Sequence, residues 1–183
     1  MNWGAIVLPL LLAGLLLYIL WYFARAGGKA LARSREVTRF RFEAKQVGAR
    51  ADPVLERLAA RVDAARRHLV PPEEILGDLD EGTQELGEAQ AMTEAMRAPP
   101  YALHLRDAMG QDLERAVRAI EMIRFGCEQS TAGRGRGAEL EAQTSVKRGY
   151  LNLLHARESL GSHLGEANRL EPLPPARARR SRI

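Results

Sequence analysis

Residues 100–128 read PYALHLRDAMGQDLERAVRAIEMIRFGCE and carry the strongest apolar pattern of the chain. Apolar residues recur there at spacings of three or four, which is the repeat of one face of an α-helix. Pro99 and Pro100 favour a corner just before the pattern. We therefore predict a long helix over 100–128. Its predicted buried face is Leu105, Met109, Leu113, Ala116, Ile120, Ile123 and Cys127.

Three more segments show helical periodicity. Asp52 before Pro53 is typical of an N-cap followed by proline at the first helical position, and predicts a helix over 53–69. After Pro71 and Pro72, a second helix is expected to reach Arg97, although its glycines permit a break near 77–82. A glycine-rich turn over 130–137 predicts the tip of a hairpin, followed by a helix over 138–170. The predicted buried faces are Leu55, Leu58, Val62, Ala65 and Leu69; Ile75, Leu79, Gly82, Leu86, Ala89, Thr93 and Met96; and Val146, Tyr150, Leu153, Leu160, Leu164 and Ala167.

These patterns predict an all-α fold. Aromatic residues make up only 5% of the 183 residues, which argues against an all-β sandwich or barrel. The lone cysteine, Cys127, excludes a disulfide framework within the chain. Each predicted helix has one apolar face and short connections, so we expect an antiparallel three- or four-helix bundle with coiled-coil-like seams. In the three-helix alternative, residues 53–69 extend from the bundle as a stalk.

The beginning of the chain is strongly apolar. Residues 3–23 contain no charged residue, and eight of them are leucine. A helix of this length reaches ~31 Å, about the thickness of the hydrocarbon core of a bilayer. The leucines contribute about −4 kcal/mol to insertion, which outweighs the glycines and the proline in the stretch. We therefore predict a single transmembrane anchor over 1–24.

A cleaved signal peptide is the alternative, because Ala24-Arg25-Ala26 resembles a cleavage site. The basic region that precedes such signals is missing, and the apolar stretch is longer than usual, so we favour the uncleaved anchor. Aromatic and basic side chains at its ends are expected to lie at the membrane interface. The predicted interface residues are Trp3, Trp21, Tyr22, Phe23, Arg25, Lys29, Arg33, Arg35, Arg39 and Arg41.

Charge divides the rest of the chain into three blocks. Residues 25–50 hold eight basic and two acidic residues, a net charge of +6. By the positive-inside rule, this block places the N-terminus outside and the remainder in the cytoplasm, in a bacterial inner membrane. Residues 51–170 carry −5 and residues 171–183 carry +3. We assign 25–52 as a basic juxtamembrane segment, 53–170 as the bundle and 171–183 as a basic Pro/Arg-rich tail.

The juxtamembrane segment also has an apolar stripe. Val37, Phe40, Ala44 and Val47 fall on one face of a helix. Such a helix can lie along an anionic leaflet, where each nearby basic residue contributes ~1 kcal/mol. A solvated stalk that only sets the topology is the alternative.

The sequence contains no catalytic or cofactor signature that we recognise. Gly133-Arg134-Gly135-Arg136-Gly137 lacks the Lys-Ser or Lys-Thr of a phosphate loop. Residues three apart share a helix face, so His155 with Glu158 and His163 with Glu166 form the strongest metal candidate. They reverse the usual Glu-x-x-His order of helical-bundle metal sites. We expect no enzyme activity and no cofactor.

One segment is markedly acidic. Residues 71–96 contain eight acidic residues and no basic ones: Glu73, Glu74, Asp78, Asp80, Glu81, Glu85, Glu88 and Glu94. We expect most of them to pair with arginines of 53–69, namely Arg57, Arg61, Arg66 and Arg67. Alternatively, the first seven form a docking face for a basic protein partner. Arg157 interrupts an apolar face and is expected either to extend its stem to solvent or to meet an acid of this segment.

Together these features predict a membrane-anchored cytoplasmic bundle that acts as a protein-interaction scaffold or assembly factor. In outline, one N-terminal span followed by long helices resembles bacterial membrane-anchored proteins of the LemA type; the resemblance involves no sequence motif and implies nothing about function. The alternative is a tether for anionic lipid or nucleic acid through the basic segment and the tail. The expected partners are the lipid bilayer and another protein, and the long seams also allow a homo-oligomer.

Overall fold

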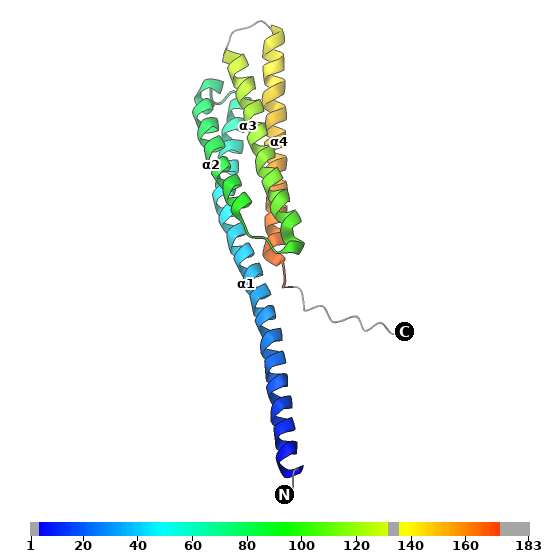
Figure 1. Ribbon diagram of the computed structural model, residues 1–183. Coiled ribbons are helices and arrows are strands. Elements are labelled where there is room, and N and C mark those ends of the chain that lie inside the picture. Colours follow the sequence, from blue (N-terminus) through cyan, green and yellow to red (C-terminus); the bar gives the residue numbers. More distant parts are fainter. Residues whose placement is uncertain (1–3, 132–135, 173–183) are drawn as a thin grey trace, which may run out of the picture. The chain divides into compact units, whose positions relative to one another are not determined.

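The structure is a computed structural model that describes residues 4–131 and 136–172, except the side chains of 4–13, 20, 22–31, 136 and 138. Its elements are α1 (Gly4–Arg66), η1 (Pro72–Ile75), α2 (Leu76–Ala95), η2 (Pro100–Ala102), α3 (Leu103–Thr131) and α4 (Arg136–Arg169), as Figure 1 shows. No strand occurs among the described residues, so the prediction of an all-α fold is confirmed.

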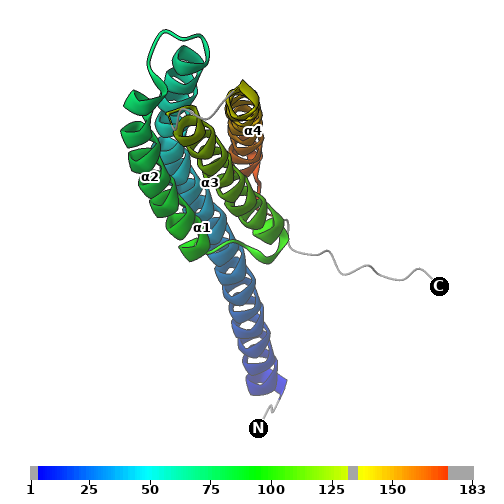
Figure 2. The same cartoon turned by 90° about the horizontal axis from the view of Figure 1, so that it is seen from above.

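The chain divides into two compact units. The first comprises Met1–Thr38 and Glu171–Ile183, and the second comprises Arg39–Leu170. In the first unit, the described residues 4–38 are helical and form the beginning of α1. The second unit holds the rest of α1 together with α2, α3 and α4 (Figure 2). This unit is a four-helix bundle, so the four-helix form of the prediction is correct.

Contacts between neighbouring helices fix their directions. Arg61 of α1 pairs with Asp78 near the start of α2, and the earlier Arg50 pairs with the later Glu88. On the other side of α1, the Arg66 guanidinium lies 5.3 Å from the centroid of the Tyr150 ring of α4. The earlier Asp52 pairs with the later Arg157. Helices α2 and α4 are therefore both antiparallel to α1.

The same holds around α3. Thr93, late in α2, lies beside Gly110, early in α3, whereas Asp80 pairs with the later Arg124. Gly126, late in α3, lies against Ala142, early in α4, whereas the earlier Asp112 pairs with the later His163. All four neighbouring pairs are thus antiparallel, as in an up-down-up-down bundle.

The predicted apolar faces meet in one core, except for Leu69, which follows the end of α1 and is 74% exposed. The predicted faces of residues 100–128 and of residues 73–97 are completely buried, and on α4 Leu153, Leu160 and Ala167 are buried. Gly82 is part of the α2 face because Leu58 of α1 packs directly over it, 2.5 Å from the position that a Cβ would take. Helix α2 has no break near 77–82. Close approach between helices therefore explains why a small residue lies on this face.

The predicted start of a helix at Asp52-Pro53 is wrong, because α1 passes through both residues without interruption. Proline removes one backbone donor from a helix interior. The missing donor leaves the carbonyl of Ala49, four residues earlier, without its helical partner. Pro53 and Ala49 both lie on the exposed side of α1, so water can bind to that carbonyl. The apolar residues before and after Pro53 are buried in one core, which keeps the helix continuous.

The predicted lipid-facing stripe is also wrong within the second unit. Phe40, Ala44 and Val47 are fully buried and belong to the core of the bundle. They are therefore not available to a membrane surface, and the solvated-stalk alternative fails for the same reason. Residues 39–52 act as part of the first bundle helix.

Helix α1 ends in a defined cap. His68 has a φ of 59°, in the left-handed region. Its N–H donates to the carbonyl of Ala65, and the N–H of Leu69 donates to the carbonyl of Ala64. These two bonds form a Schellman motif, which satisfies the last carbonyls of the helix. The end of α1 at Arg66 is thus close to the predicted end at residue 69.

No helix within the described part of the chain combines enough length and apolarity to cross a membrane. Of the predicted interface residues, Trp3 lies outside the described residues, and so do the side chains of Tyr22, Phe23, Arg25 and Lys29. Trp21, Arg33, Arg35 and Arg39 are exposed, and Arg41 is half-buried. The tail over 173–183 and the turn over 132–135 also lie outside the described residues.

Candidate interaction surface

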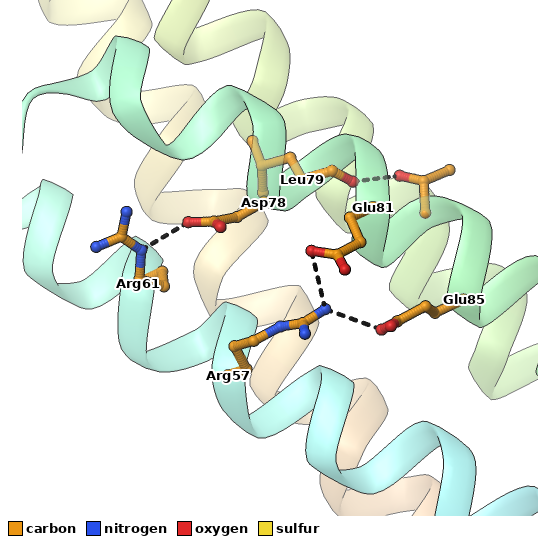
Figure 3. Close-up of polar contacts among 7 residues, drawn as sticks. Arg57, Arg61, Asp78, Leu79, Glu81 and Glu85 are labelled. Carbon is orange, nitrogen blue, oxygen red and sulfur yellow. Dashed lines mark hydrogen bonds and ion pairs between the residues drawn. The ribbon is translucent and has the colours of Figure 1, made fainter.

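A ladder of ion pairs joins α1 to the acidic helix α2. Arg61 Nε lies 2.6 Å from Asp78 Oδ2. One turn earlier on α1, Arg57 Nη2 lies 2.8 Å from Glu85 Oε2 and 3.7 Å from Glu81 Oε2, as Figure 3 shows. The Arg57 side chain points between the two carboxylates, one on each side. The expectation that α2 acids pair with α1 arginines is therefore confirmed for these residues.

The ladder extends to arginines that the sequence did not indicate. Arg50 of α1 pairs with Glu88, and Arg124 of α3 pairs with Asp80 on the opposite edge of α2. The sequence did not indicate these two pairs, because only arginines of the predicted helix over 53–69 were expected to meet the acids of α2. These side chains are largely exposed, so each pair stabilises the bundle by only about 0–1 kcal/mol.

Arg66 and Arg67 do not reach α2, contrary to prediction. Both pair with Asp63 of their own helix, at 2.8 and 2.7 Å. The hydrogen bond from Arg66 and the nearby Arg67 charge lower the pKa of Asp63. Pairing within α1 is favoured over pairing with α2, because residues three and four apart in a helix are already neighbours.

Part of the predicted docking face remains unneutralised. Glu73 and Glu74 are exposed at the start of η1, and neither is in an ion pair within the described chain. Glu94, which follows the predicted docking face, accepts a long hydrogen bond from Gln90, at 3.4 Å. The structure therefore splits the predicted acidic face into a neutralised α1 edge and a few acids that still present net negative charge.

An open groove of about 630 Å³ runs along the outer side of α1 and α2. Ala49, Pro53, Val54 and Met92 give it an apolar floor. Charged residues border the floor, among them Arg57 and its partner Glu85, so the ion-pair ladder forms part of the groove wall. The groove is open along its length, unlike the enclosed cavity of a typical small-molecule site.

Arg157 meets acids of a different helix from the predicted one. Its Nε lies 3.0 Å from Asp52 Oδ1, and its Nη2 lies 3.2 Å from Glu56 Oε2. Both acids belong to α1 rather than to α2. The sequence placed Asp52 at a helix start, which concealed its position on a helix face beside α4.

Asp112 is the charged side chain whose burial the sequence did not reveal. It is only 1% exposed, between α3 and α4. Arg115 Nη1 lies 2.9 Å from its Oδ1, and His163 Nδ1 lies 2.7 Å from its Oδ2. Both carboxylate oxygens therefore have partners, as a buried charge requires.

The four residues of the metal candidate do not come together. His155 and Glu158 are exposed, and His163 is engaged with Asp112 instead. Glu166 lies 3.9 Å from His104 of α3. In the described residues, no group of three or more His, Cys, Asp or Glu side chains is arranged to hold a metal ion.

Cys127 is buried on the α3 seam, where the sequence placed it. Burial, together with the negative charges of Glu128 and Glu73, raises the pKa of its thiol to about 11. The thiol is therefore neutral near pH 7, and a neutral buried thiol is a poor nucleophile.

No family model, curated protein or solved structure matches this chain, so the surfaces described above are the basis for any statement about its function.

Proposed function

We propose that the protein is anchored in a bacterial inner membrane by its N-terminal segment and that its cytoplasmic bundle is a non-enzymatic scaffold or assembly factor. The observation that carries the anchor is a run of exposed apolar side chains in α1. Leu15, Leu16, Leu17 and Tyr18 are each at least 55% exposed, and Trp21 is 56% exposed. So many adjacent apolar groups are stable only against lipid or another protein.

Exposed basic residues support the proposed orientation. Arg33 and Arg35 are exposed shortly after the apolar run. The segment 25–50 carries a net charge of +6, which favours the cytoplasmic side. The bundle that follows would then lie in the cytoplasm.

The surface along α1 and α2 supports the proposal of a protein partner. Its groove offers an apolar floor, and the exposed Glu73 and Glu74 add negative charge at one end of α2. A partner with an apolar segment flanked by basic residues would complement both features. The acids already paired with arginines would contribute little to its binding.

Site-specific photo-crosslinking in native membranes tests the proposal. A crosslinker at position 92, on the groove floor, should trap one defined protein. Replacing both acids (Glu73→Gln and Glu74→Gln) should weaken that adduct, and the matched control (Glu139→Gln and Glu141→Gln on α4) should leave it unchanged. Absence of any adduct at position 92, or equal loss in both variants, would argue against a partner on this surface.

The alternative is a tether for anionic lipid or nucleic acid. It draws support from the exposed Arg33, Arg35 and Arg39. Because Phe40 and Ala44 are buried, such binding would rest on charge alone. It should therefore fall steeply with salt. Binding of the chain from residue 25 onward to phosphatidylglycerol vesicles or to DNA, measured from low to physiological salt, tests it, and salt-independent binding would exclude it.

A further inference from the structure

Helix α4 carries a second heptad-like series on its outer side, in addition to the face that packs in the core. Its members are spaced alternately by four and three residues. They are Leu140, Thr144, Lys147, Leu151, Leu154, Glu158, Gly161 and Gly165. Leu140 is 67% exposed and Leu151 is 54% exposed, whereas the core residue Leu153 is fully buried. An alternating spacing with exposed leucines is the pattern of a coiled-coil seam that needs a partner. We call this series the outer seam.

We propose that the outer seam pairs with the outer seam of a second copy of the chain, in antiparallel orientation. The two-fold axis would pass between residues 152 and 153. Each residue then faces the one at an equal distance on the other side of the axis. Leu151 of one copy lies opposite Leu154 of the other, which is half-buried at the edge of its own core, so the centre of the interface is apolar.

Charge complementarity supports this register. The next layer outward places Lys147 opposite Glu158 of the second copy, and two-fold symmetry repeats the pair. Both residues are exposed, and neither is in an ion pair within the described chain. In a parallel dimer each lysine would instead face the lysine of the other copy and each glutamate the other glutamate. Like charges in direct opposition disfavour that arrangement.

Size complementarity supports the same register. The outermost layers place Leu140 opposite Gly165 and Thr144 opposite Gly161. A Cβ built on either glycine would meet nothing within 4 Å, so the space above each glycine is open. The Leu140 and Thr144 side chains of a second copy can fill the space above Gly165 and Gly161. The seam is thus complementary to itself in apolar contact, charge and size, and all its residues belong to one helix of the bundle.

A charge-swap series on the full chain in mild detergent tests the proposal by sedimentation across a wide range of concentrations. The wild-type chain should show twice the protein mass of the 20.3 kDa chain. Lys147→Glu or Glu158→Lys alone should raise the dissociation constant about tenfold, because each introduces two repulsive pairs. The double variant, Lys147→Glu with Glu158→Lys, should restore dimerisation, since it reverses both signs together.

A second pair of variants tests the apolar centre. Leu151→Glu should abolish the dimer, whereas Leu69→Glu, at an exposed leucine outside the seam, should not. Far-UV circular dichroism confirms that each variant is folded. A wild-type chain that stays monomeric, a double variant that dimerises no better than the single variants, or a dimer that tolerates Leu151→Glu would each overturn the proposal.

Discussion

The carbonyl oxygen of Ala119 on α3 lies 2.8 Å from the position that a Cβ on Gly149 of α4 would take. About two turns along the same helix pair the roles are exchanged, and the carbonyl oxygen of Ala142 on α4 lies 2.8 Å from the corresponding position on Gly126 of α3. The two backbones are therefore in direct contact, which only glycine permits at these positions. This contact brings the α3 and α4 backbones together at both positions.

Gly149→Ala should destabilise the bundle by about 1–3 kcal/mol, because the new methyl group meets backbone atoms that cannot move aside. Gly87→Ala is the matched control, since a Cβ there meets nothing within 4 Å. It should stabilise α2 by about 0.5–1 kcal/mol through higher helix propensity. Guanidinium unfolding followed by far-UV circular dichroism measures both, and a stabilising Gly149→Ala would contradict the close contact.

Phe40→Ala should cost about 3–5 kcal/mol of unfolding free energy, because Phe40 is fully buried in the bundle core. Phe42 lies two residues away and is 60% exposed, so Phe42→Ala should stay within about 0.5 kcal/mol of wild type. The same unfolding measurement compares the two. Equal effects would mean that residues 39–52 are not part of the bundle.

The periodicity of single segments predicted most of this fold. The faces beginning at Leu105 and Ile75 are buried as expected. Apolar residues at helical spacing lie on one side of the helix, and that side is the one removed from water. The continuity of α1 through Pro53 could not be predicted in this way. It depends on Phe40 and Val47 reaching the same core as the residues after Pro53, which is a tertiary property.

Asp112→Ala should destabilise the bundle by about 1–3 kcal/mol, because it removes both hydrogen bonds of a buried carboxylate. Asp107→Ala is the control: the Asp107 side chain is 56% exposed and pairs with the adjacent Arg106. That change should have an effect within about 0.5 kcal/mol. Equal free energies of unfolding for the two variants would show that the hydrogen bonds of Asp112 do not stabilise the packing of α3 against α4.

Cys127 predicts a loss of stability at alkaline pH. Its folded pKa is raised to about 11, so the folded chain keeps the proton while the unfolded chain releases it. The stability that the protonated thiol gives to the folded chain is fully present below the unfolded pKa of about 8.5 and is lost as pH rises towards 11. The free energy of unfolding should fall over this window in wild type and fall less in Cys127→Ala. Identical pH slopes would show that the thiol is accessible to water.

The candidate surface was less predictable than the core. Arg57 and Arg61 were correctly assigned to α2 acids, because both lie on the predicted helix over 53–69 and α2 follows it directly. Asp112 was missed, although it lies on the small-residue face of α3 with Ala119 and Gly126. A search for a second stripe beside the strongest one would have found it. Which acids meet which arginines depends on helix rotation, which sequence periodicity does not fix.

Alkaline carbonate extraction of cell membranes is the direct test of whether the apolar N-terminal segment holds the bundle at a membrane, as we propose. The comparison uses the full chain and the variant Leu11→Arg with Leu17→Arg, since each arginine adds about 3 kcal/mol to the cost of insertion. The wild-type chain should stay in the membrane pellet, and the variant should be released. A wild-type chain recovered in the soluble fraction would contradict it.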